Sequence, residues 1–130
     1  MEFRKLGKPV HGPSKELDTF PKPEGVNLVR FTTDEVTSFC PVTGQPDFST
    51  VILEYGPEHL CIESKSLKLY FWSFRDEALM AERLASVVVA DIAHAIAPRW
   101  VKVEVRQNVR GGLQLTAVAE WHKDAPITSG

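Results

Sequence analysis

Residues 100–121, WVKVEVRQNVRGGLQLTAVAEW, decide the fold class of this chain. Valines alternate with charged residues in the first half, and leucine and alanine alternate with polar residues in the second half. Each pattern is typical of a strand with one buried face. The Arg-Gly-Gly sequence at positions 110–112 separates the halves and favours a tight turn. The stretch therefore predicts an antiparallel hairpin, with strands over residues 100–109 and 113–121.

Two helices are predicted immediately upstream of this hairpin. Residues 77–96 place a row of apolar side chains on one side of a helix: Met80, Leu84, Val87, Val88, Ile92 and Ile96. Pro98 ends that helix, since proline disfavours helical geometry in the residue before it. Residues 64–74 carry apolar residues at spacings of three, one and three, and this pattern predicts a shorter helix.

Two further strands are predicted before the helices, over residues 26–33 and 48–55, with a possible short extended piece at 59–62. The order is then β-β-α-α-β-β, an α+β fold with an antiparallel sheet. Four strands leave two unpaired edges. A chain of this size can solve that problem by joining sheets across subunits into a closed barrel.

Length and composition fit one globular domain. The chain has 130 residues, 43% hydrophobic and 25% charged, with a net charge of −2. We expect an extended, proline-rich arm over residues 1–25, the folded domain over 26–122 and a tail over 123–130. The slight negative charge disfavours general nucleic-acid binding. No apolar run is long enough for a membrane span, and the charged start resembles no secretion signal, so a cytoplasmic protein is expected.

Two cysteines are too few for a disulfide framework, so we expect free thiols. Cys61 lies in an apolar run and is assigned no role. Cys40 lies in the loop FCPVTGQPDF, residues 39–48, and Asp47 follows seven residues later. A loop rich in proline and glycine is rigid enough to position chemical groups. Spacing alone nevertheless favours a packed structural cysteine and a turn aspartate.

The segment ESKSLKLY, residues 63–70, allows two interpretations. Lys65 and Lys68 share one face of the predicted helix, and serines begin it. This arrangement suits either phosphate binding at a helix N-terminus or serine capping beside solvated lysines. Periodicity makes Glu82 a surface residue. The histidines are scattered, and the sequence predicts no metal site.

Together these segments resemble the QueF family of 7-cyano-7-deazaguanine reductases, in its single-module form. The resemblance rests on residues 39–48, on ESKSLKLYFWSFR at 63–75, and on Pro98-Arg99 with Arg110-Gly111-Gly112, and covers roughly residues 10–122. It implies the tunnelling fold, in which β-β-α-α-β-β units close into a multi-subunit barrel. It also implies a homo-oligomer, a decamer of two pentamers, with active sites between subunits.

The resemblance further implies a reaction. Cys40 would attack the nitrile of 7-cyano-7-deazaguanine to form a covalent thioimide, and Asp47 would give a proton to the nitrogen. Hydride from NADPH would reduce the adduct to 7-aminomethyl-7-deazaguanine, a step of queuosine biosynthesis for transfer RNA. Nitrile to amine is a four-electron change, so two NADPH are needed per product.

The remaining site residues also come from the resemblance. Glu82 would accept hydrogen bonds from the two donors on the guanine-like edge of the base. Ile62, Glu63 and Ser64 match the other substrate-binding segment. Ala81 stands where family members usually have histidine, so that side chain offers no hydrogen bond.

The NADPH phosphates would lie near Lys65 and Lys68, with Arg110 as a further candidate. No direct nucleic-acid contact and no membrane contact is implied.

Three other functions remain open from the sequence. The first is a QueF-like amidinotransferase that acts on the nitrile base within transfer RNA and lacks the ESKSLK-type motif. The second is a non-catalytic pterin- or purine-binding protein on the same fold. The third is a purely structural oligomer.

Overall fold

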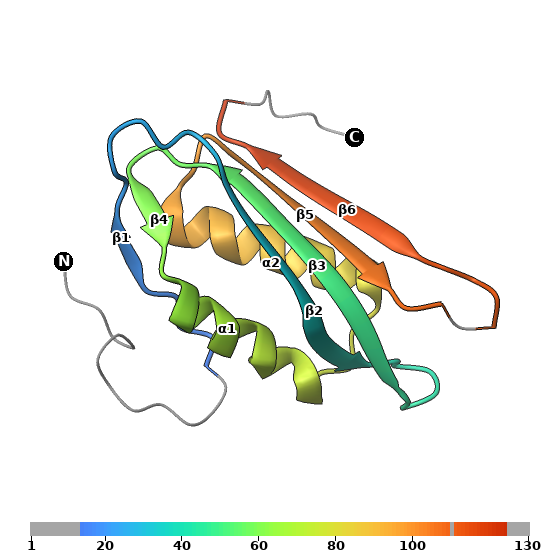
Figure 1. Cartoon of the computed structure of the whole chain (residues 1–130). Helices are drawn as coiled ribbons and strands as arrows, with labels where there is room; N and C mark the ends of the chain where they lie inside the picture. The colour runs from blue at the N-terminus through green and yellow to red at the C-terminus, as the bar shows by residue number, and fades with distance from the viewer. Residues whose placement is uncertain (1–13, 110, 125–130) are drawn as a thin grey trace.

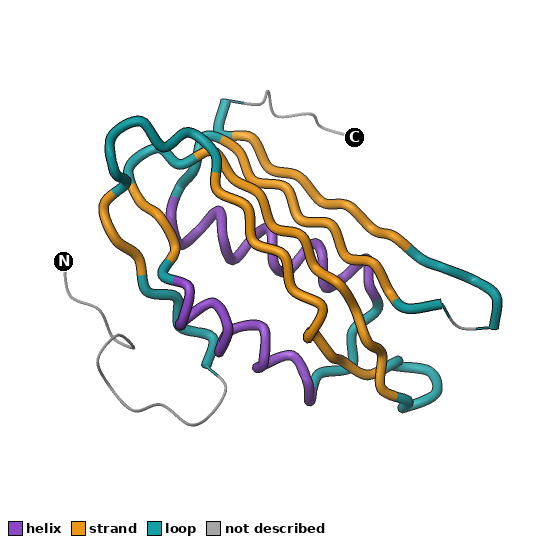
Figure 2. Tube along the Cα trace, viewed as in Figure 1, coloured by secondary structure: helices purple, strands orange, loops and turns teal. Residues whose placement is uncertain are grey.

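The computed structural model describes residues 14–109 and 111–124, which form two layers. One layer is a four-stranded antiparallel sheet in the order β2-β3-β5-β6, and the helices cover one of its faces (Figures 1 and 2). The elements of these layers are β2 (Val29–Phe39), β3 (Pro46–Gly56), α1 (Ser64–Trp72), α2 (Ala81–Ile96), β5 (Trp100–Gln107) and β6 (Thr116–His122). The predicted α+β class and the β-β-α-α-β-β order are confirmed.

The C-terminal hairpin forms as its alternation predicts. β5 pairs with β6 from Trp100 opposite His122 to Arg106 opposite Thr116. The three valines of β5 are fully buried under α2. The turn is wider than expected, because β6 begins at Thr116 and Leu113 is exposed. Gly111 and Gly112 both have positive φ, at 57° and 78°, a conformation that glycine adopts without steric cost.

The strand β2 starts later than predicted and continues beyond the predicted end at residue 33. The continuation was missed because the alternation of inward and outward side chains changes in the middle of the strand. Its pairing with β3 shifts between Thr33 and Val36, which marks a β-bulge. A bulge adds one residue to a strand and moves every later side chain to the opposite face. Val36 and Ser38 are buried after the bulge. The strand therefore continues to Phe39, the residue before Cys40.

Both predicted helices are present, and the second begins later than expected. A 3₁₀ turn, η1 (Ser73–Asp76), follows α1. Residues 77–80 are extended, because the N–H of Leu79 donates to the carbonyl of Phe39 at 3.0 Å. α2 ends at Ile96 and is followed by Ala97 with φ 43°, directly before Pro98. The buried side of α2 packs on β5 and β6.

A second, two-stranded sheet takes one of its strands from the region expected to be an unpacked arm. β1 (Thr19–Pro21) pairs with β4 (Leu60–Ile62) in antiparallel register. Asp18 is only 3% exposed, and its N–H donates to the Ser66 hydroxyl at 2.9 Å. β1 and the buried Asp18 therefore pack part of the expected arm onto the folded domain. The domain boundaries stay a prediction, and residues 1–13 and 125–130 lie outside the described residues.

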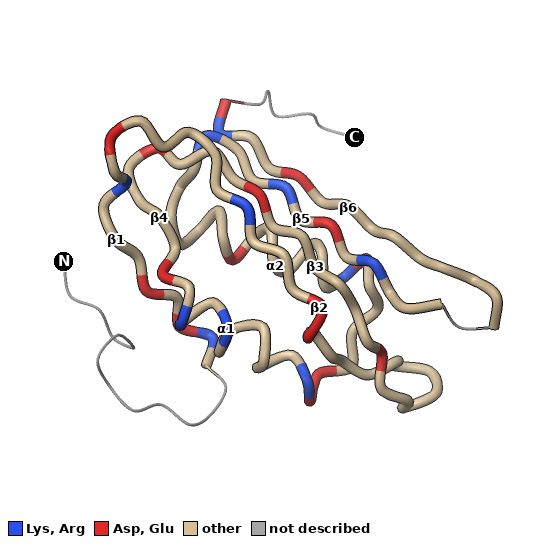
Figure 3. Tube along the Cα trace, viewed as in Figure 1, with Lys and Arg blue, Asp and Glu red and all other residues tan. Residues whose placement is uncertain are grey.

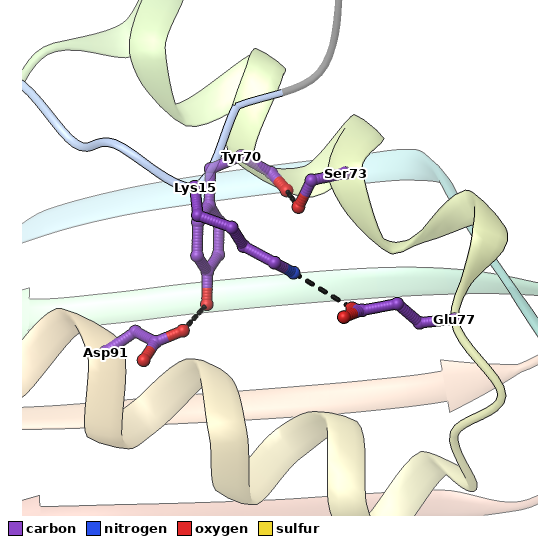
Figure 4. Close-up of polar contacts among 5 residues, drawn as sticks. All are labelled: Lys15, Tyr70, Ser73, Glu77 and Asp91. Atoms are coloured by element: carbon purple, nitrogen blue, oxygen red, sulfur yellow. Dashed lines mark hydrogen bonds and ion pairs between the residues drawn. The ribbon is translucent and has the colours of Figure 1, made fainter.

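Polar contacts tie α1 and the N-terminal segment to the rest of the helical layer (Figure 4). The buried Tyr70 hydroxyl donates to Asp91 on α2 at 2.6 Å. Burial and this carboxylate raise the pKa of Tyr70 well above its usual range. Lys15 lies over the Phe74 ring and pairs with Glu77 at 2.9 Å. These contacts fix the segment that leads into α2. None of the described helices combines the length and hydropathy needed to cross a bilayer.

Candidate functional site

A closed turn between β2 and β3 holds Cys40. The Cys40 N–H donates to the carbonyl of Gln45, and the Gly44 N–H donates to the carbonyl of Cys40, both at 2.9 Å. Gly44 has φ 70°, a left-handed backbone conformation that residues with a side chain rarely adopt. The proline and glycine content that made this loop a candidate thus produces a fixed geometry. Cys40 itself is half-buried at the end of β2.

Asp47 lies on β3, at the start of the row of side chains that faces the helices. Ser49, Val51, Leu53 and Tyr55 continue this row and are buried. Asp47 is 7% exposed and lies opposite Ser38 in the register. The carboxylate is therefore at the end of the core and beside the Cys40 turn. Asp47 is thus a buried strand residue, whereas spacing alone favoured a turn residue.

The backbone before Cys40 also fixes the start of α2. The Phe39 N–H donates to the carbonyl of Glu77 at 2.8 Å, and the Phe39 carbonyl accepts from Leu79 at 3.0 Å. This short parallel pairing places residues 77–80 alongside the end of β2. Ala81 and Glu82, the first residues of α2, follow at once. Two segments about forty positions apart in sequence are thereby joined at one point.

A cavity of about 330 Å³ lies at this junction and brings four of the predicted residues together. Its lining comprises Cys40, Pro41, Thr43, Gln45, Asp47, Met80, Ala81, Glu82, Gln107 and Leu115. Glu82 is exposed toward it, whereas Ala81 is 1% exposed and offers only its methyl group. Cys40, Asp47 and Glu82, the predicted nucleophile, acid and carboxylate acceptor, thus line one cavity within a single chain.

The groups around the Cys40 sulfur act on the pKa of its thiol in both directions. The Thr43 hydroxyl and the backbone N–H groups of Thr43 and Val42 lower the pKa of the Cys40 thiol below its usual value. Burial and the charge of Asp47 act in the opposite direction and are smaller. A lower pKa increases the fraction of thiolate, which is the nucleophilic form. Cys61, in contrast, is 3% exposed beside Tyr55 and packs as a structural residue.

The other predicted residues lie elsewhere, at the start of α1. Figure 1 shows the β2–β3 turn beyond one end of the sheet, while β4 and the first turn of α1 lie toward the other end. Ile62 and Glu63 are buried, and Ser64 and Lys68 are exposed. None of these four residues contributes to the Cys40 cavity. The structure therefore does not bring the two predicted groups together within one chain.

Glu63 caps α1, where serine capping had been one interpretation. Its two carboxylate oxygens accept the N–H groups of Lys65 at 2.7 Å and Ser66 at 2.8 Å. The Ser66 hydroxyl donates to the Glu63 carbonyl at 2.9 Å. An acidic cap satisfies two of the four free N–H groups and complements the helix dipole. This carboxylate occupies the place where an anion would otherwise bind the end of the helix.

A groove of about 510 Å³ runs between α1 and β2. Ser64, Lys68 and the partly exposed Trp72 line its α1 side, and Phe31 and Glu35 lie on its β2 side. Lys65 is half-buried and does not line it. Figure 3 shows basic positions in the first half of α1. An exposed lysine, a hydroxyl and an aromatic ring suit a phosphate-bearing ligand with flat rings.

Arg110 lies outside the described residues. Among residues 14–109 and 111–124, no three His, Cys, Asp or Glu side chains gather as metal ligands would. Sequence reasoning missed six lining residues of the cavity: Pro41, Thr43, Gln45, Met80, Gln107 and Leu115. The position of Thr43 and Gln45 between Cys40 and Asp47 was the available signal for those two.

Known proteins resemble this chain over most of its length. A family model described as QueF-like protein matches residues 46–126. The NADPH-dependent 7-cyano-7-deazaguanine reductase of Halorhodospira halophila is 48% identical, over 85% of this chain and 95% of the relative. The reductase of that name from Syntrophus aciditrophicus is 44% identical, over 85% and 81%. The crystal structure of the archaeosine synthase QueF-Like in the apo form is similar with a TM-score of 0.72 and 28% identity, over 79% of this chain and 100% of that chain. The last likeness confirms the tunnelling fold of the single chain, and closure into a barrel between subunits stays a prediction.

Proposed function

Because this chain belongs to the QueF-like protein family, we propose that it reduces the nitrile of 7-cyano-7-deazaguanine to an aminomethyl group with NADPH, through a thioimide on Cys40. The reaction is a step of queuosine biosynthesis, and the chain is an oxidoreductase. The observation that carries the catalytic assignment is the shared cavity of Cys40, Asp47 and Glu82. A nucleophile, an acid and a base-binding carboxylate are the groups that this chemistry needs.

The residues of the cavity act in a defined order. The Cys40 thiolate attacks the nitrile carbon and forms a C–S bond, while Asp47 gives a proton to the nitrogen. The product is a neutral thioimide attached to the enzyme. NADPH supplies the two hydrides that the reduction requires. After the first reduction the C–S bond breaks and Cys40 recovers its electron pair, and a second reduction of the released imine completes the amine.

The direct test of this function is cofactor consumption with the free nitrile base. Mixing the protein with 7-cyano-7-deazaguanine and NADPH should lower the absorbance of reduced nicotinamide. Two NADPH should disappear for each aminomethyl product found by mass spectrometry. Absence of oxidation with the free base, together with reaction of the base within transfer RNA, would support the amidinotransferase alternative. The reductases at 44% and 48% identity favour the reductase over that alternative.

Glu82 is proposed to recognise the base. Its exposed carboxylate lines the cavity from the first turn of α2 and has two acceptor oxygens. Glu82→Gln keeps one acceptor and adds a donor that repels the guanine-like edge. We expect base binding to weaken by on the order of 1–3 kcal/mol, roughly 5- to 150-fold in Kd. Titration calorimetry measures this, with Glu24→Gln as an exposed control outside the cavity. An unchanged Kd in Glu82→Gln would place recognition elsewhere.

Lys65 and Lys68 are proposed to bind the NADPH phosphates. Lys68 lines the groove beside α1, and a lysine ammonium is a compact charge suited to phosphate. Lys68→Ala should raise the KM for NADPH roughly tenfold and leave binding of the nitrile base unchanged. Lys65→Ala should also raise the KM for NADPH.

The effect of these lysine variants should be larger for NADPH than for NADH if either lysine contacts the 2′-phosphate. Steady-state kinetics with both cofactors measure it, and Lys123→Ala on the C-terminal turn is the control. Equal and small effects on both cofactors would remove these lysines from the site and leave Arg110 as the remaining candidate.

The separation of the two groups of residues supports a site shared between subunits. The Cys40 cavity lies beyond one end of the sheet and residues 62–68 lie toward the other, so neighbouring copies would have to combine them. Among the described residues, β2 and β6 are the edge strands of the four-stranded sheet, and edge strands can pair with a neighbouring copy. We propose a decamer of two pentamers in the cytoplasm, without direct contact to nucleic acid or membrane. Sedimentation analysis of the full chain measures its size.

A further inference from the structure

Thr43 lies three residues after Cys40 in the turn between β2 and β3, and the reaction scheme above gives it no role. We propose that Thr43 is a positioning residue that donates its hydroxyl proton to the Cys40 sulfur and holds that sulfur toward the cavity. This inference rests on the proposed function, because it explains how the proposed nucleophile is kept ready for attack.

The turn leaves the Thr43 hydroxyl proton available for the sulfur. The Thr43 oxygen accepts the Gln45 N–H at 3.3 Å. A hydroxyl has two acceptor positions and one proton, so this contact leaves the proton free to be donated. The two backbone hydrogen bonds that close residues 40–45 fix Thr43 relative to Cys40. Thr43 also lines the same cavity as the sulfur.

The electrostatic surroundings explain why a neutral donor is needed. The charged groups that line the cavity are Asp47 from β3 and Glu82 from α2, and both are acidic. β5 and the segment before β6 contribute the uncharged Gln107 and Leu115. No described lining residue is basic. Hydrogen bonds from the Thr43 hydroxyl and from two backbone N–H groups lower the pKa of the thiol, against the opposing effects of burial and of the Asp47 charge.

A hydroxyl also suits the chemistry better than a cation. The thiolate loses its negative charge when the C–S bond forms, so any group that stabilises the thiolate opposes attack to some degree. Nucleophilicity falls as the thiol pKa falls, and the best thiol has a pKa near the ambient pH. A single neutral donor gives a moderate stabilisation. It raises the thiolate fraction without making the sulfur a poor nucleophile.

The test measures the rate at which iodoacetamide alkylates Cys40 as a function of pH, with the modified peptide identified by mass. In Thr43→Val the midpoint of this profile should move up by about one pH unit, because one hydrogen bond to the charged sulfur is lost. Thr43→Ser keeps the hydroxyl and should restore the wild-type midpoint. If Thr43→Val does not fold by circular dichroism, Thr43→Ala replaces it.

A matched control comes from Thr33, whose hydroxyl accepts the Glu35 N–H at 3.2 Å in the same local arrangement outside the cavity. Thr33→Val should leave the Cys40 midpoint unchanged. An unshifted midpoint in Thr43→Val, or an equal shift in Thr43→Ser, would overturn the proposal. Nitrile adduct formation is measured separately. A shifted midpoint without any adduct would leave the hydrogen bond standing and reject the proposed reaction.

Discussion

Replacing Cys40 with alanine is expected to abolish nitrile reduction, with a loss on the order of 10⁴-fold or more in turnover. The reaction needs a covalent bond to the nitrile carbon, and alanine provides no nucleophile. The loss of a covalent nucleophile is among the largest effects that a single substitution produces. Base binding should persist, since Asp47 and Glu82 still line the cavity. NADPH oxidation and equilibrium dialysis of the base measure these two properties.

The matched control for this experiment is the second cysteine. Cys61 is 3% exposed on β4, in the other sheet, and does not line the cavity. Cys61→Ala removes a thiol from the core and should lower stability slightly while leaving turnover near normal. If Cys61→Ala lost turnover and Cys40→Ala retained it, the nucleophile would have to be Cys61 and Cys40 would be the structural thiol.

Asp47→Asn is expected to bind the base but to lose roughly 10²- to 10⁴-fold in turnover, the usual contribution of a positioned acid. The amide has nearly the same shape as the carboxyl group and fits the buried position. It has no acidic proton for the nitrogen of the nitrile. Single-turnover measurements of thioimide formation should show that this step is slowed, before any hydride transfer.

The control for Asp47→Asn is Asp76→Asn, since the Asp76 side chain is 77% exposed at the end of η1. It makes the same chemical change outside the cavity and should leave turnover unchanged. Wild-type turnover in Asp47→Asn would mean that another group supplies the proton, and Glu82 would be the next carboxyl group to test.

The strands that could be predicted from the sequence are those whose alternation is uninterrupted. β5 is the best example, because three valines face α2 and the residues between them face away. The second half of β2 was not predicted, because the bulge between Thr33 and Val36 breaks the period of two. β4 falls within the short extended piece expected at residues 59–62, whereas β1 is stabilised by pairing with β4, a tertiary effect without a local signal.

The site could be predicted from the sequence only in part, because tertiary pairing brings some of its residues together. Cys40 and Asp47 lie on one hairpin and share one loop motif, but spacing alone favoured structural roles, and only the resemblance connected them as site residues. Glu82 appeared as an ordinary exposed helix position, and only the resemblance assigned it to the site. Its place in the cavity depends on Phe39, whose backbone pairs with Glu77 and Leu79. Such pairing joins distant segments through main-chain groups, which carry no side-chain pattern.

The central claim is that Cys40 forms a thioimide with the nitrile, and intact-mass analysis tests it most directly. The protein is incubated with 7-cyano-7-deazaguanine in the absence of NADPH, so that the adduct cannot be reduced. The wild-type protein should gain the mass of one base per chain, located by peptide mapping on Cys40, and Cys40→Ala should gain none. An adduct that persists in Cys40→Ala, or NADPH oxidation by a wild-type protein that never forms an adduct, would contradict the claim.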